Sequence, residues 1–140
     1  MDFFDALIRY ETDLWNRLDD ALSAAGEVSL ATLEALRVVA RHEGRGRVHE
    51  LQEELRITVG SASKLADRLE RDQLAVRHPN PHDRRSSVLG LTETGRESEA
   101  RGTAVLAAAL GAHLAESESD LSTITTTLRE LDGLLERSAK

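Results

Sequence analysis

The chain contains no cysteine among its 140 residues, and its aromatic residues are one Trp, one Tyr and two Phe. Without cysteine there is no disulfide, no thiolate zinc site and no thiol-based redox switch. No apolar run approaches the roughly 20 residues that span a bilayer. The N-terminal segment MDFFDALIRYETDLW has acidic residues where an export signal needs basic ones. We therefore expect a cytoplasmic protein that does not associate with membranes.

The sequence also lacks the motifs of common enzymes. It has no Walker-type phosphate loop, no HExxH and no GxSxG, and its carboxylates are spread along amphipathic segments where solvated charge is the ordinary explanation. The five histidines form no tight ligand pair, since His42 and His49 straddle a connector and His78 and His82 lie across a polar tip. We expect no enzymatic activity, no bound metal and no cofactor.

Positive charge is scarce overall but is concentrated in the middle of the chain. The net charge is -7, with 18 Lys or Arg against 25 Asp or Glu. Residues 41–85 hold ten Lys or Arg and eight Asp or Glu, a sum of +2, so the other residues hold eight against seventeen, a sum of -9. Because Lys and Arg displace counterions from phosphates, the central segment is where a nucleic acid is expected to bind.

Helical periodicity dominates the first third of the chain. Apolar residues recur on one face from about Asp2 to Ala25, and Ser29 is a plausible N-cap for a second helix that continues toward Gly44. The following GRGR segment is a basic connector. We expect Val48 to add a very short strand that closes against a later hairpin.

The segment from His49 to Asp72 has the pattern of a helix-turn-helix. A short helix over 49–56 is followed by Thr58, which can cap a second helix whose buried stripe is Ala62, Leu65, Ala66 and Leu69. An isolated polar helix face is usually only solvated. In this sequence the helix follows a short helix and precedes a basic hairpin, and this order favours the DNA major groove as the partner of its polar face. The residues predicted to contact DNA from this helix are Thr58, Gly60, Ser61, Lys64 and Arg68, with Ser63 at the margin.

A β-hairpin is predicted directly after this helix. Leu74 and Val76 begin one strand, Val88, Leu89 and Leu91 form the other, and both prolines, Pro79 and Pro81, are expected in the turn because proline cannot continue a ladder. An arginine at such a tip can enter the narrow, electronegative minor groove. The predicted DNA contacts of the tip are Arg77, Arg84 and Arg85, and Asp83 is expected to orient Arg84 or Arg85 by a charge-assisted hydrogen bond.

These motifs resemble the multiple antibiotic resistance regulator (MarR) family of winged helix-turn-helix transcription factors. The hairpin, or wing, carries the family pattern of Asp, Arg, a hydrophobic strand, Leu-Thr and Gly, and DRLERDQL at 67–74 resembles the end of the family's recognition helix. The pattern falls on Asp83, Arg85, Val88, Leu91, Thr92 and Gly95, and Thr92 can cap a long helix that follows. One departure is Gly60, because a glycine costs about 1 kcal/mol of helix stability relative to alanine.

The resemblance implies a fold class and a domain organisation. The fold is expected to be mainly α with a small β-hairpin wing, in a single MarR-like domain over residues 1–140. Residues 29–95 are the expected DNA-binding lobe, and about 1–28 and 96–140 are expected to form dimerisation helices.

The apolar stripes of the terminal helices support this expectation of a homodimer. Such stripes leave a large hydrophobic surface for so small a domain, and symmetric pairing is the commonest way to cover it. A helical bundle packed within one chain is the alternative. The expected interface residues are Phe4, Leu7, Leu110, Leu121, Ile124, Leu128 and Leu131.

The resemblance implies a homodimeric, sequence-specific regulator, most simply a repressor of a pseudo-palindromic site on double-stranded DNA. Family members often respond to small molecules, commonly aromatic or anionic, bound between the dimer helices and the winged lobe. Trp15 either lines such a pocket or belongs to the core or the dimer interface. The alternative function is a winged-helix adaptor that binds another protein and tolerates loss of Lys64, Arg68, Arg84 and Arg85.

Overall fold

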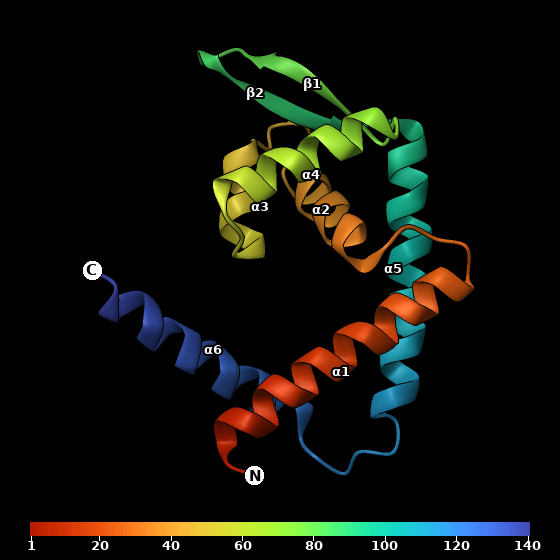
Figure 1. Ribbon diagram of the computed structural model, residues 1–140, viewed down its shortest axis with the longest axis vertical. Helices are drawn as coiled ribbons and strands as arrows, with labels where there is room; N and C mark the ends of the chain where they lie inside the picture. The colour runs from red at the N-terminus through yellow and green to blue at the C-terminus, as the bar shows by residue number, and fades with distance from the viewer. The chain divides into compact units, whose positions relative to one another are not determined.

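The computed structural model describes residues 1–140 and contains six helices and a two-stranded hairpin (Figure 1). This confirms the predicted fold class. The chain divides into two compact units, Met1–Leu110 and Gly111–Lys140. The elements in order are α1 (Phe3–Ala24), α2 (Leu30–Arg41), α3 (Val48–Leu55), α4 (Val59–Arg71), β1 (Ala75–Asn80), β2 (Asp83–Leu91), α5 (Glu93–Leu114) and α6 (Leu121–Ser138).

Hydroxyl caps start three of these helices where the sequence predicts them. The side chains of Ser29, Thr58 and Thr92 each accept a hydrogen bond from the backbone N–H three residues later, at 3.2, 3.1 and 2.9 Å. Each cap satisfies a backbone donor that has no partner within the helix. The predicted starts of α2, α4 and α5 are therefore confirmed.

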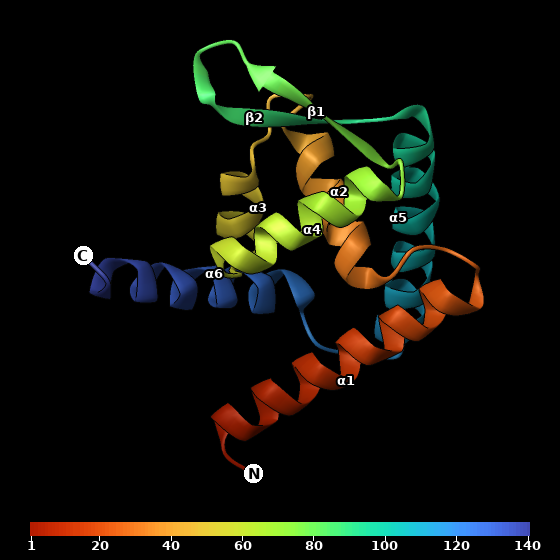
Figure 2. The same ribbon diagram turned by 45° about the horizontal axis from the view of Figure 1, so that its top comes forward.

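One hydrophobic core joins the helix-turn-helix to the hairpin. The predicted stripe of α4 is buried, and it packs with side chains from α2, α3 and the strands. Figures 1 and 2 show the hairpin at one end of this lobe, next to α2 and α4. The core residues are Ala35, Leu36, Val38, Val39, Leu51, Ala62, Leu65, Ala66, Leu69, Leu74, Ala75 and Leu89.

A second cluster connects α1 and α5 to the start of α2. Leu18 and Leu22 of α1 are buried with Leu30 and Leu33 of α2, and apolar side chains of α5 pack against them. A Cβ on Gly102 would lie only 2.7 Å from Cδ1 of Leu33, so glycine permits this close approach of α5 to α2. The lobe is thus anchored to both of its flanking helices.

The strand predicted at Val48 is wrong, because Val48 begins α3. The bridge to the hairpin forms two residues earlier, where the N–H of Leu89 donates to the carbonyl of Gly46 at 2.6 Å. The backbone N–H of Arg47 donates to the Glu50 carboxylate at 2.6 Å. This bond turns the chain into a helix before Val48 can pair.

The position predicted for Pro79 is also wrong, whereas Pro81 lies in the turn as predicted. Pro79 belongs to β1 and pairs with Ser87, and the register shifts between Pro79 and Asn80. In a two-stranded sheet each strand has a free edge, where a residue without an N–H is tolerated. A proline was therefore accommodated inside the strand.

The second unit contains α6 and the segment before it. Asp120 caps α6 by accepting from the N–H groups of Ser122 and Thr123 at 3.0 and 3.3 Å. The hydrogen bonds from Thr123 lower the pKa of the Asp120 carboxyl. No residue of α6 is buried, and its leucines are exposed. No helix in the chain combines the length and the apolar character that crossing a membrane requires.

Candidate nucleic-acid interface

The outer face of α4 carries the polar residues that the sequence predicts for DNA contact. Gly60, Ser61, Lys64 and Arg68 are exposed and Ser63 is half-buried, while the opposite stripe is buried in the core. The hydroxyl of Thr58 is used locally, since it caps α4 and donates to Oγ of Ser61 at 3.0 Å. Thr58 therefore sets the start of the helix, and the residues after it form the accessible face.

Gly60 lies in open space at the beginning of this face. A Cβ built on it would have no neighbouring atom within 4 Å, and its φ is not positive. The fold therefore does not require glycine here. A missing side chain leaves room for a ligand to approach the backbone closely.

Val59 is a candidate contact that the sequence analysis missed. It is the first residue of α4, and 60% of its surface is exposed although it is apolar. Its spacing from Ala62 suggests a place in the buried stripe, but the first turn extends beyond the core. An apolar side chain here can contact a thymine methyl group.

Arg77 lies within β1 and not at the tip of the wing, where it was predicted. It pairs with Leu89 of β2. Its Nη2 donates to Oδ1 of Asp67 at 2.5 Å, and its Nε lies 4.0 Å from Oε1 of Glu70. Its side chain is only 31% exposed. Arg77 therefore connects β1 to α4, and its DNA contact stays a prediction. The signal for this link is two carboxylates three residues apart on α4, followed by an arginine in the next strand.

The tip of the wing exposes Arg84 and Arg85 and is ordered by its own side chains. Oδ1 of Asp83 accepts from the backbone N–H of Arg85 at 3.0 Å, and Oδ1 of Asn80 accepts from the N–H of His82 at 3.0 Å. Asp83 thus orients the backbone of Arg85 and not, as the sequence predicts, a guanidinium. Short side-chain to backbone bonds of this kind stabilise turns.

The connector arginine Arg47 is paired within the lobe. Its Nη2 donates to Oε1 of Glu50 at 2.8 Å, and this hydrogen bond raises the pKa of Arg47. Partial burial acts to raise the pKa of Glu50, but hydrogen bonds from Arg47 outweigh it, so that pKa is lowered. With Arg77 and Arg47 paired to carboxylates, Lys64, Arg68, Arg84 and Arg85 are the exposed cations of the predicted site.

The histidines are arranged for local pairing. Nε2 of His42 lies 2.8 Å from Glu54, and Nε2 of His49 lies 3.1 Å from Glu53. The structure gathers no group of three or more His, Asp or Glu side chains around a common point.

Trp15 projects from α1 and is 41% exposed. It lines a cavity of about 250 Å³ whose walls come from α1, α2, α3, the turn after α3, and α4. Of the two roles that the sequence leaves open for Trp15, its position at this cavity favours the first.

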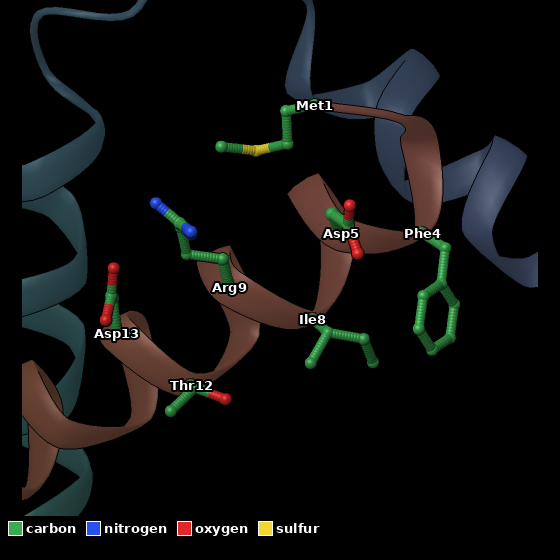
Figure 3. Close-up of a pocket in the computed structure, with 7 residues that line it drawn as sticks. All are labelled: Met1, Phe4, Asp5, Ile8, Arg9, Thr12 and Asp13. Carbon is green, nitrogen blue, oxygen red and sulfur yellow. The ribbon is translucent and has the colours of Figure 1, made fainter.

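The first half of α1 presents a different kind of surface. Figure 3 shows seven residues around a depression of about 600 Å³, all from this end of the chain, with Phe4 and Ile8 projecting from the same side of the helix. A depression lined by one helix has no opposing wall, so it is a face that another element can cover. Its residues are Met1, Phe4, Asp5, Ile8, Arg9, Thr12 and Asp13.

Residues 27–86, which contain α2, α3, α4 and most of the wing, match the sequence model of the MarR family. Over its winged helix-turn-helix lobe the chain is thus similar to the MarR family. None of the curated proteins matches the chain by sequence.

Solved structures of the MarR family have the same fold over nearly the whole chain. AbsC, a MarR family transcriptional regulator from Streptomyces coelicolor, superimposes with a TM-score of 0.83 at 22% identity, covering 95% of this chain and 91% of AbsC. CouR bound to a 23-mer DNA duplex gives 0.74 at 24%, covering 99% and 93%. CouR from Rhodococcus jostii RHA1 bound to p-coumaroyl-CoA gives 0.78 at 22%, covering 93% and 88%. At these identities the similarity establishes the fold.

Proposed function

We propose that this protein is a homodimeric transcription regulator of the MarR family that binds a pseudo-palindromic site on double-stranded DNA and represses transcription. The observation that carries the proposal is the exposed row of Ser61, Lys64 and Arg68 on α4, next to a wing whose tip exposes Arg84 and Arg85. The similarity of the lobe to the MarR family favours a regulator over an enzyme.

The chemistry of this surface suits a duplex. An α-helix fits the major groove, where small residues at the N-terminal end of α4 allow close approach and Lys64 and Arg68 reach phosphates or guanines. Arg84 and Arg85 then enter or border the adjacent minor groove. The complex of CouR with a DNA duplex supports this use of the fold.

The exposed apolar faces support a homodimer. Phe4 and Leu7 of α1 are exposed, and so is the apolar stripe of α6 that contains Leu121, Ile124, Leu128 and Leu131. A second copy would cover these faces and set two recognition helices about one DNA turn, roughly 34 Å, apart. Leu110 is half-buried against the cluster around Leu18 and Leu22, so the interface rests mainly on α1 and α6.

We assign to the segments of the chain the same roles that the sequence predicts. Residues 29–95 bind DNA, and about 1–28 and 96–140 mediate dimerisation within a single MarR-like domain. The protein acts in the cytoplasm without a cofactor, and a small molecule at the Trp15 cavity releases it from DNA. The ligand-bound structure of CouR supports a small-molecule effector.

The test is a fluorescence anisotropy titration of the protein onto DNA from upstream of its own gene, against scrambled DNA, at several salt concentrations. We expect selective binding of one dimer per site that weakens steeply as salt rises. Weak binding that ignores sequence on this DNA, and on fragments selected from the whole genome, would favour the winged-helix adaptor instead.

A further inference from the structure

The cavity beside Trp15 is lined by several elements, in contrast to the face of α1, which one helix forms. Trp15 comes from α1, Ala31 and Glu34 from α2, Glu54 and Leu55 from α3, Ile57 from the following turn and Leu65 from α4. Its volume is about 250 Å³. A small organic molecule is therefore the size of ligand that fits.

Most of the lining is apolar. Trp15 shares the lining with three aliphatic side chains of the helix-turn-helix, namely Leu55, Ile57 and Leu65. Trp15 is 41% exposed, so its ring is available to a ligand. A ligand with an aromatic or alkyl body gains from burial against this surface.

The charged side chains that line the cavity are all negative. They are the carboxylates of Glu34 and Glu54. Arg37 pairs with Glu34 at 2.9 Å, but it is not part of the lining. The same holds for Arg41 and His42, which pair with Glu54 at 3.5 and 2.8 Å. The lining itself thus offers an anion two carboxylates and no cation, while the arginines that pair with these carboxylates lie outside it.

Both carboxylates keep capacity for a further partner. The side chains of Glu34 and Glu54 are 30% and 36% exposed. A carboxylate offers about four lone-pair sites, and the pairs with Arg37, Arg41 and His42 use only some of them. A cationic group in the cavity can thus be held by carboxylate oxygens while it contacts the indole face, which is the best side chain for cation–π contact.

We propose that the Trp15 cavity binds small apolar organic cations, such as aryl or alkyl ammonium compounds, and disfavours aromatic acids. This inference rests on the proposed role as a ligand-responsive regulator and names the chemical class of its effector. It differs from the acyl-CoA bound by CouR. Occupancy is coupled to the DNA-binding face because Leu65, which lines the cavity, belongs to the buried stripe of α4.

The experiment compares benzyltrimethylammonium with phenylacetate, two benzyl-based probes of opposite charge. Trp15 is the single tryptophan of the chain, so quenching of intrinsic fluorescence reports on ligands bound beside it, and variants of the two carboxylates tell this cavity from the depression that Trp15 lines with Glu11, Thr12 and Asn16. We expect the cation to bind at least about tenfold more tightly than the anion, which corresponds to about 1.4 kcal/mol. Equal binding, tighter binding of phenylacetate, or no quenching by either probe would overturn the proposal.

Charge-removing variants then test the two carboxylates. Glu34→Gln and Glu54→Gln should each weaken cation binding about fivefold without weakening phenylacetate. Glu53→Gln, one residue from Glu54 but outside the lining, should leave both affinities unchanged. Glu34→Gln loses only a local pair within α2, so it remains informative if Glu54→Gln disturbs the fold.

Operator binding measured on the same samples separates the two proposals. Selective DNA binding without preference for the cation would overturn only the ligand class. Cation-selective quenching by a protein that binds no specific DNA would overturn the proposed function and leave the cavity's ligand class supported.

Discussion

Arg77 of β1 donates through Nη2 to Oδ1 of Asp67 on α4, 2.5 Å away, and so joins the wing to the recognition helix. Glu70, one turn further along α4, lies 4.0 Å from Nε of the same guanidinium. The wing and the helix must contact one duplex together. Arg77 is therefore placed to set the relative position of the two elements.

The link predicts an energetic coupling between Arg77 and Asp67. Because both partners are partly exposed, a double-mutant cycle of Arg77→Gln and Asp67→Asn should give about 0.5–1 kcal/mol of coupling in urea denaturation. The matched control is Arg45 with Glu43, an exposed pair 4.0 Å apart, which should give a coupling near zero. Zero coupling at Arg77, combined with a smaller salt dependence of DNA binding in Arg77→Gln, would identify Arg77 as a phosphate contact instead.

Arg85→Ala should weaken DNA binding with little effect on folding, because its side chain is exposed at the tip. We expect a loss of about 1–3 kcal/mol in operator affinity if it reads a base edge, or a salt slope smaller by about one if it contacts a phosphate. Anisotropy titrations and thermal denaturation measure the two effects. Arg17→Ala, at an exposed position of α1 outside the depression on the first half of that helix, serves as a control of equal charge change. Unchanged operator affinity would remove the wing-insertion mechanism.

Gly60→Ala should separate stability from function. A Cβ at Gly60 meets nothing within 4 Å, so alanine should stabilise α4 by up to about 1 kcal/mol. The same methyl group would project where the helix approaches DNA, so operator affinity should fall. Gly111→Ala, also in a helix and in open space, should gain similar stability and leave DNA binding unchanged. An increase in operator affinity for Gly60→Ala would show that this position does not approach the duplex.

Gly95→Ala should have the opposite effect on stability. A Cβ there would lie 1.9 Å from the carbonyl oxygen of Leu74, where backbone rather than a flexible side chain is in the way. We expect a destabilisation of at least about 3 kcal/mol, because the start of α5 must move away from the end of the α4–β1 connection. Chemical denaturation followed by circular dichroism measures it, and a stability within about 0.5 kcal/mol of the parent protein, the size of a typical surface effect, would contradict the close packing.

Leu128→Asp should disrupt assembly. Leu128 is 45% exposed on the apolar stripe of α6, and pairing would bury a carboxylate among leucines. Light scattering should show half the mass of the parent protein. Thr126→Asp introduces the same charge on the opposite side of α6 and should leave the dimer intact. A fully dimeric Leu128→Asp would reject α6 as an interface.

The sequence by itself determined the helices, the hairpin and their order, because their signals are local. Three helix starts are each marked by a hydroxyl that caps the N–H three residues later, at Ser29, Thr58 and Thr92. The buried face of α4 follows from the spacing of Ala62, Leu65, Ala66 and Leu69. Exposure of Lys64, Arg68 and Arg85 follows from the same periodicity and from their place in the hairpin.

Tertiary structure alone decided which side chains meet across elements. The positions of Pro79 and of the bridging residue Gly46 depend on strand register, which local propensity does not specify. The pairing of Arg77 with Asp67 depends on how β1 crosses α4. The cavity at Trp15 exists because helices distant in sequence pack around it, and the single sign of its lining charge depends on which way Arg37 and Arg41 turn. These relations arise from packing in three dimensions, so periodicity and spacing along the chain do not contain them.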